Sequence, residues 1–116
     1  MKDKFTAENR DDAHGNPAGG KVEGAGLLIE WQNGPLGRGE DRKEPNGAFV
    51  ETVIAAVIHR IEYYQGNNKF RCRENALAVT KLEEALHWLN SRTERREQEG
   101  TEGTHKEEAH AGHSHN

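Results

Sequence analysis

The chain has 116 residues, of which 32% are hydrophobic and 31% are charged, and its formal net charge is −4. A chain of this length forms one domain at most, and the acidic balance argues against bulk non-specific binding of DNA or RNA, which requires a basic surface. No apolar run has the length of a membrane span, and the first residues lack a signal-peptide pattern. The single cysteine, Cys72, excludes an intrachain disulfide and indicates a reducing cytoplasm.

The apolar residues lie almost entirely between residues 27 and 89. Residues 1–24 are rich in glycine and polar side chains, and residues 100–116 are nearly all polar. Neither stretch buries enough apolar surface to offset the entropy of ordering, so we predict a disordered N-terminal tail (1–24) and a flexible His-rich tail (100–116). A folded domain over residues 25–99 remains. The histidines of the second tail could hold a divalent metal adventitiously, but a solvated polar tail is the simpler interpretation.

The first predicted element is a short β element. Residues 27–32 (Leu-Leu-Ile-Glu-Trp-Gln) have β-branched and aromatic character and are followed by the turn signal Asn-Gly-Pro at 33–35. Residues 36–45 are glycine-rich and charged, which indicates a loop. Because one strand alone is unstable, this element must pair with another strand or lie on helices.

The next element is a helix that begins near Ala48. Asn46 is its expected N-cap, and Gly66 is its expected C-terminal stop. Apolar residues recur through it at steps of three and four, as in a helix with one broad apolar face. They are Phe49, Val50, Val53, Ile54, Val57, Ile58 and Ile61.

A second helix begins near residues 71–74 and extends to about Gln98. Its apolar stripe comprises Leu77 (or Ala76), Val79, Leu82, Ala85, Leu86 and Leu89, with Trp88 beside it. The short loop between the helices makes them antiparallel neighbours. The predicted fold class is therefore mainly α: an antiparallel helical hairpin with a short N-terminal β element and disordered tails. Two such helices expose more apolar surface than they hide from each other, which predicts an oligomer.

Signatures of catalysis are missing. The sequence has no Ser-His-Asp pattern and no phosphate-binding glycine loop, and Cys72 has no histidine near it in the sequence. The adjacent Glu83 and Glu84 point in different directions from a helix, so they cannot flank one bond. We predict a protein that is not an enzyme and has no cofactor and no metal site.

Aromatic residues and an asparagine gather where the first helix ends and the second begins. The rings of Tyr63, Tyr64 and Phe70 can stack on a nucleobase, and Asn75 can donate to and accept from an adenine edge. Plain core packing at the hairpin turn is the alternative interpretation.

Two arginines lie near the other end of the second helix. Arg92 and Arg96 are four residues apart, so they share a face and can clamp a phosphate or pyrophosphate; a solvated pair bonded to nearby glutamates is the alternative. Seventeen residues separate Asn75 from Arg92, about 26 Å along one helix. One chain therefore cannot bring both ends to a small ligand, whereas two antiparallel second helices can, in two equivalent sites.

The residues from Phe70 to Leu89, above all the stretch from Cys-Arg-Glu-Asn-Ala to Trp-Leu, form a familiar pattern. The segments 29–35, 46–47, 92–93 and 102–105 fit it as well. The pattern resembles the phage Thoeris anti-defence sponge family, which shares a helical hairpin domain with phage anti-CBASS cyclic-nucleotide sponges. The resemblance covers roughly residues 27–105.

This resemblance implies binding without catalysis. Such proteins sequester cyclic ADP-ribose isomers in the host bacterial cytoplasm, some members also bind cyclic di- or trinucleotides, and they form hexamers from dimers. The family's ligand site lies between subunits and corresponds here to Tyr64 (or Tyr63), Asn75, Arg92 and Arg96. Two alternatives remain open: an oligomeric helical-hairpin module that docks a host protein, and an enzyme that degrades the signal. Neither DNA nor a membrane is expected as a partner.

Overall fold

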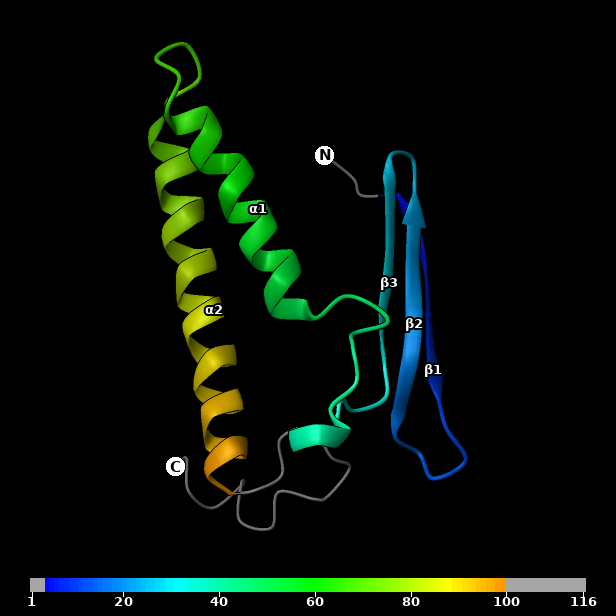
Figure 1. Ribbon diagram of the computed structural model, residues 1–116. Helices are drawn as coiled ribbons and strands as arrows, with labels where there is room; N and C mark the ends of the chain where they lie inside the picture. The colour runs from blue at the N-terminus through cyan, green and yellow to red at the C-terminus, as the bar shows by residue number, and fades with distance from the viewer. Residues whose placement is uncertain (1–3, 100–116) are drawn as a thin grey trace. The chain divides into compact units, whose positions relative to one another are not determined.

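The computed structural model describes residues 4–99, whose elements are shown in Figure 1. The strands are β1 (Phe5–Asp11), β2 (Pro17–Gly24) and β3 (Leu27–Asn33); the helices are η1 (Gly39–Asp41), α1 (Val50–Gln65) and α2 (Arg73–Gln98). The described residues belong to two compact units. We call residues 4–48 with 95–99 the sheet unit and residues 49–94 the helical unit. The predicted His-rich tail, residues 100–116, lies outside the described residues.

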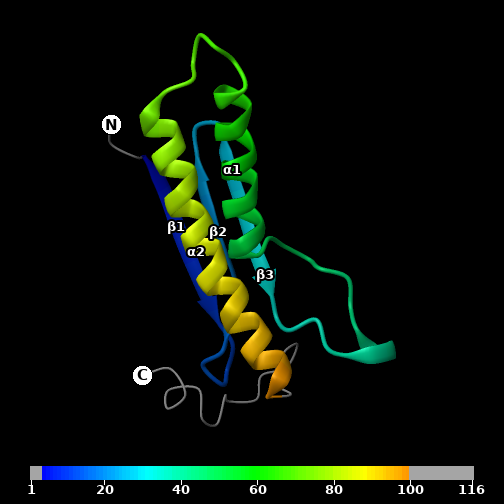
Figure 2. The same ribbon diagram turned by 90° about the vertical axis from the view of Figure 1, so that its left-hand side faces the viewer.

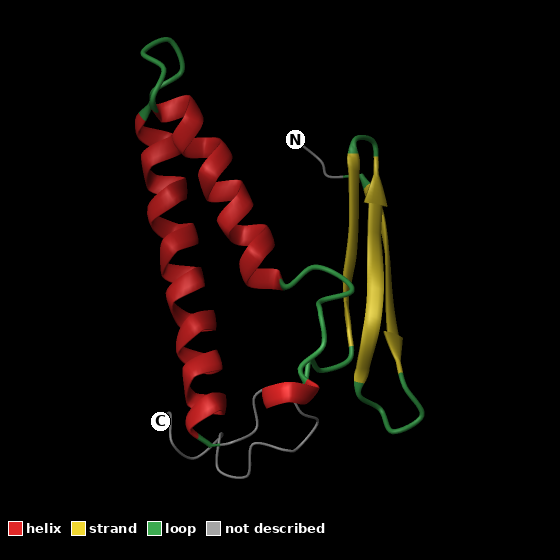
Figure 3. Cartoon of the chain, in the orientation of Figure 1, coloured by secondary structure: helices red, strands yellow, loops and turns green. Residues whose placement is uncertain are grey.

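The predicted fold class is wrong in the N-terminal part of the chain. A three-stranded antiparallel sheet of order β1-β2-β3 precedes the helices (Figure 3). Only β3 matches the predicted β element, and the stretch predicted as a disordered tail contains β1 and β2. The fold is therefore a sheet plus two helices, in which the helical hairpin is one part.

The register of the sheet explains why a stretch of low hydrophobicity folds. Ala7 of β1 pairs with Val22 of β2, which pairs with Ile29 of β3. Alternation along the strands places Phe5 and Trp31 on this same face. Each strand contributes only a few apolar side chains, but the three strands together form one apolar face.

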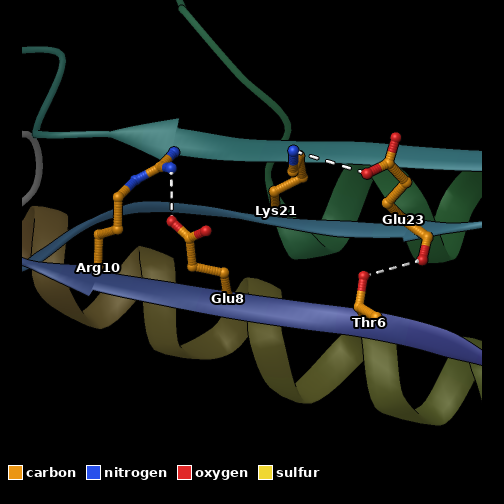
Figure 4. A network of polar contacts seen from close by, with 5 residues as sticks. All are labelled: Thr6, Glu8, Arg10, Lys21 and Glu23. Carbon is orange, nitrogen blue, oxygen red and sulfur yellow. Dashed lines mark hydrogen bonds and ion pairs between the residues drawn. The ribbon is translucent and has the colours of Figure 1, made fainter.

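The opposite face of the sheet is held by charge pairing. Glu8, Lys21 and Glu30 lie level with one another on the three strands, so opposite charges alternate across the sheet. Within β1, Arg10 Nη1 lies 2.9 Å from Glu8 Oε2, and within β2, Lys21 Nζ lies 3.6 Å from Glu23 Oε1 (Figure 4). Opposite charges that face each other across two strands contribute about 0.2–1 kcal/mol, whereas exposed ion pairs within one strand, such as these two, contribute little. The facing charges therefore support strands that hydrophobicity alone does not predict.

The turn between β1 and β2 is organised by Asp12. Its Oδ1 accepts hydrogen bonds from the backbone N–H groups of His14 (2.8 Å) and Asn16 (3.0 Å). Gly15 adopts a left-handed φ of 79° in the same turn, which favours glycine. The amides of Asn16 and His14 stabilise the carboxylate and lower the pKa of Asp12 below its usual value.

The segment that leads to α1 runs beside β3. Gln32 N donates to Ala48 O at 2.9 Å, and Trp31 and Ala48 form a parallel bridge. The side chain of Asn46 accepts from Asn33 N at 2.8 Å and donates to Asn33 O at 3.0 Å. The prediction of Asn46 as the helix N-cap is therefore wrong. Phe49 occupies the cap position without a side-chain cap bond, and Asn46 ties the segment to β3 instead.

In the helical unit, α1 and α2 run antiparallel beside each other (Figures 1 and 2). Gly66 caps α1, and α2 spans Arg73–Gln98; both boundaries confirm the predictions. Thr93 donates to Glu51 at 3.3 Å and links the C-terminal part of α2 to the first turn of α1. Within residues 4–99, neither helix has an apolar stretch of the length and character that crossing a bilayer requires.

Candidate functional site

Three aromatic rings contact one another at the tip of the helical hairpin. The ring centroids of Tyr63 and Tyr64 are 5.8 Å apart, and those of Tyr64 and Phe70 are 6.2 Å apart in an edge-on arrangement. Tyr63 is 60% exposed and Phe70 57% exposed, so these rings are not core residues. Plain packing, the alternative that the sequence left open, therefore does not account for them. Rings held in this way offer faces on which a planar ligand can stack.

Arg60 joins this cluster, and the sequence reasoning missed it. Its guanidinium carbon lies 4.9 Å from the ring centroid of Tyr63 and 4.9 Å from that of Tyr64. Arg60 Nε also donates to the Tyr64 hydroxyl at 3.1 Å. The signal was present in the sequence, because an arginine three and four residues before two tyrosines shares their helix face. The hairpin tip thus combines aromatic rings with the positive charge of the Arg60 guanidinium, which is held against them.

The loop that carries Phe70 is braced by hydrogen bonds. Gln65 Oε1 accepts from Cys72 N at 3.0 Å, while Gln65 Nε2 donates to Cys72 O at 3.1 Å. Arg71 Nε donates to Gln65 O at 2.7 Å. These bonds join the end of α1 to the start of α2. A ligand that binds the rings therefore meets a partly pre-organised surface, which lowers the entropic cost of binding.

Asn75 lies half-buried beside this loop. Its Nδ2 donates to Phe70 O at 3.3 Å, which ties the loop to the first turns of α2. In the part of the chain that the structure describes, no hydrogen bond reaches Asn75 Oδ1. That oxygen can accept from an amino group of a ligand. Asn75 thus positions the loop through its side-chain nitrogen.

The structure brings four of the six predicted site residues together and leaves two apart. Tyr63, Tyr64, Phe70 and Asn75 gather at the hairpin tip, while Arg92 and Arg96 lie near the other end of α2. Arg92 is exposed and makes no hydrogen bond or ion pair within residues 4–99. Arg96 is half-buried and already engaged by other residues. Seventeen residues of α2 separate Asn75 from Arg92, which corresponds to about 26 Å along the helix.

The sheet unit has a second basic feature. Arg38, Gly39, Arg42 and Glu97 line a shallow cavity of about 340 Å³. Its two arginines favour an anion, but the Glu97 carboxylate opposes one. Among the described residues, no group of three or more His, Cys, Asp or Glu side chains is arranged to hold a metal ion.

Comparison with known proteins gives a consistent result. The family model described as "Acb2/Tad1, hairpin domain" matches residues 25–94. The chain is also 61% identical over 78 residues to a protein named Thoeris anti-defense 1 from Bacillus phage SBSphiJ7. That alignment covers 67% of this chain and 51% of the relative, so the chain spans about half the length of the curated relative it matches. The matched region contains α1, the hairpin tip and most of α2. The chain belongs to the Acb2/Tad1 hairpin-domain family.

Proposed function

We propose that this protein counters bacterial defence by binding a nucleotide immune signal and sequestering it without cleaving it. The ligand class is a cyclic ADP-ribose isomer, and cyclic di- or trinucleotides form a second class. The site of action is the host bacterial cytoplasm, where such signals are made. The name of the phage relative supports the anti-defence role. The observation that carries the ligand class is the exposed cluster of Tyr63, Tyr64 and Phe70 with Arg60 at the hairpin tip.

The chemistry of the tip fits a nucleotide better than a peptide side chain. Stacked rings bind the flat face of a base, and each such stack contributes about 1–3 kcal/mol. The Oδ1 atom of Asn75 can accept from an exocyclic amine, and Arg92 and Arg96 can bind a pyrophosphate through charge-assisted bonds. These residues hold and orient a ligand. Sequestration requires no base or nucleophile, only burial and a slow off-rate.

One chain does not complete such a site. Because the hairpin tip and the two arginines lie at opposite ends of α2, a ligand of nucleotide size cannot contact both in a single protomer. The proposal therefore includes a dimer in which Arg92 and Arg96 of one copy approach the tip of another. Such dimers assemble further into a hexamer. Two identical sites per dimer follow from the symmetry.

The direct test is titration calorimetry of the full chain with cyclic ADP-ribose isomers and a panel of cyclic oligonucleotides. Bound ligand is then released by heat and analysed by chromatography. Tight binding with unchanged ligand supports a sponge, and a converted product would show an enzyme. No binding across the panel would contradict the proposal. In that case, a pull-down that recovers a host protein in stoichiometric amount would favour a module that docks a host protein.

The site assignment is tested with single substitutions. Asn75→Ala should weaken binding about fivefold and Arg92→Ala about tenfold or more, because a neutral hydrogen bond contributes about 1 kcal/mol and one to a charged group about 1.5–3 kcal/mol. Lys4→Ala removes an exposed cation that precedes β1 and serves as the matched control. Wild-type affinity in both site variants would show that the ligand binds elsewhere.

A further inference from the structure

The side chain of Gln65, the last residue of α1, bonds to the backbone of Cys72 through both of its amide atoms. Its Oε1 accepts from Cys72 N at 3.0 Å, and its Nε2 donates to Cys72 O at 3.1 Å. The backbone carbonyl of Gln65 also accepts from Arg71 Nε at 2.7 Å. These bonds converge on one residue and close the chain between positions 65 and 72 into a loop. We call this set of bonds the Gln65 clamp.

The Gln65 clamp holds the residue from which α2 starts. Cys72 directly precedes Arg73, the first residue of α2, and its carbonyl accepts a bond from Ala76 N at 3.3 Å. The side chains that usually fix this position are Ser, Thr, Asp and Asn, and cysteine is not one of them. Gln65 acts in their place from outside the helix, because it bonds to both the N–H and the carbonyl of Cys72. The clamp therefore fixes the backbone at which α2 begins.

Two residues of the candidate ligand site lie close to Cys72 in the chain. Phe70 lies in the loop just before it, and Asn75 lies in the first turn of α2 just after it. Asn75 Nδ2 donates to Phe70 O at 3.3 Å, so the two residues are also joined directly. A shift of Cys72 relative to α1 is therefore passed to both site residues, while the tyrosine rings stay with α1.

We propose that Gln65 is a positioning residue of the ligand site. It acts through Phe70 and Asn75, which its amide holds beside the tyrosine rings of α1, and not by contact with the ligand. This role rests on the proposed function, and it adds a residue that lies outside the aromatic and basic pattern of the site. Without the clamp, the hairpin tip adopts its binding arrangement for only part of the time, and the apparent affinity falls by that fraction.

The clamp requires a neutral amide of this length. An amide offers both an acceptor and donors, whereas a carboxylate only accepts and would meet the Cys72 carbonyl with like polarity. Asparagine is one methylene shorter, and a hydrogen bond tolerates little increase in distance. Methionine has nearly the length of glutamine but no N–H donor and only a weak acceptor. Gln65→Met therefore removes the two side-chain bonds with little change in volume.

Binding kinetics of a cyclic ADP-ribose isomer to the full chain test the proposal. Gln65→Met should weaken binding about threefold to tenfold, the effect of losing two hydrogen bonds between neutral groups. The loss should appear mainly as slower association, because a smaller fraction of hairpin tips is ready to bind. Removal of a direct ligand contact would mainly speed dissociation instead.

Two further variants separate positioning from a general effect of the substitution. Gln98→Met makes the same change at an exposed glutamine at the far end of α2 and should bind as the wild type does. In a Phe70→Ala background, Gln65→Met should have a smaller effect than in the wild type, because one of the two residues that it positions has lost its ring.

Amide hydrogen exchange of the ligand-free chain tests the clamp itself. The Cys72 N–H should exchange about fivefold faster or more in Gln65→Met, while the amides in the middle of α1 keep their wild-type rates. Unchanged Cys72 exchange, wild-type affinity in Gln65→Met, a loss seen only in dissociation, an equal loss in Gln98→Met, or an undiminished effect in the Phe70→Ala background would each overturn the proposal. A wild type that binds no signal nucleotide would contradict the proposed function and this role with it, so the two failures are distinguishable.

Discussion

At the hairpin tip, one guanidinium lies against two tyrosine rings and donates to one of their hydroxyls. A cation over an aromatic face contributes about 0.5–2 kcal/mol, and here the same side chain orients two rings at once. Arg60 therefore shapes the surface on which a ligand would stack. Its planar group can also reach a phosphate, which a lysine would do with less directional control.

Substitution of Arg60 should accordingly affect ligand affinity more than folding. Arg60→Ala is expected to weaken binding of the signal nucleotide about tenfold, because the rings lose both their cation and their orientation. Arg60→Lys keeps the charge without the planar fork and should give an intermediate loss. Titration calorimetry measures both, with thermal unfolding as the check on stability. Wild-type affinity in Arg60→Ala would show that the ligand does not use this cluster.

Gly47 is a position where one methyl group should matter. A Cβ there would lie 2.5 Å from the carbonyl oxygen of Trp31, where the segment before α1 runs beside β3. Gly47→Ala should therefore lower the free energy of unfolding by about 1–3 kcal/mol, since backbone must shift to relieve the clash. Gly66→Ala is the matched control, because its Cβ would make only ordinary contacts, the nearest at 3.5 Å. Urea unfolding at one protein concentration compares the stability of the two variants. An equal loss of stability in both would contradict the close approach of Gly47 to the Trp31 carbonyl.

At the scale of elements, the helices could be predicted and two of the strands could not. The apolar residues of α1 are dense and regularly spaced, and Gly66 gives its end a clear signal. In β1 and β2 the positions on the apolar face include glycine, alanine and asparagine, so the alternation is too dilute to detect in one strand. Composition alone then resembles that of a disordered tail. The strands form through backbone pairing with neighbouring strands, and those partners lie at a distance in the sequence.

The β1–β2 turn gives a prediction about pH. The amides of Asn16 and His14 stabilise the Asp12 carboxylate, so its pKa is lower in the folded chain than in the unfolded one. The hydrogen bonds stabilise the folded chain above the pKa that Asp12 has in the unfolded chain, about 4. This contribution is lost as the pH falls through the lower pKa that Asp12 has in the folded chain. The backbone amide chemical shifts of His14 and Asn16 should report the protonation of Asp12. Their midpoint should lie below the ordinary pKa range of an aspartate. The shifts should not titrate in Asp12→Asn, and a midpoint at or above about 4 would contradict the turn geometry.

For the whole molecule, the main feature is how little apolar surface each chain buries. In the described residues the buried hydrophobic side chains are Leu36 in the sheet unit and Ile58 in the helical unit, and no side chain falls below 2% exposure. Chains of this size often gain stability from association. The exposed Leu77 and Trp88 of α2 and the exposed Phe5 and Leu28 of the sheet are consistent with that expectation.

A concentration-dependent melting temperature is therefore expected. If the folded state is a complex of copies, raising the protein concentration from about 1 to 100 μM should raise Tm by mass action. The dependence should become weaker in Trp88→Ala, which removes an exposed indole of α2. Differential scanning fluorimetry over a dilution series measures it. A Tm that is independent of concentration would show that the single chain is stable by itself.

The sequence by itself determined the two helices, the end of the first, the family, and which side chains offer aromatic or basic chemistry. These features depend on residues close together in the chain, where periodicity and local motifs carry the information. Only the tertiary structure revealed the sheet of β1 and β2 and the use of Asn46 as a tie to β3. It also placed Leu77, which the sequence assigned to the apolar stripe of the second helix, among the exposed residues. Each of these depends on which distant segments or neighbouring side chains meet in space, and the linear spacing of residues does not specify that.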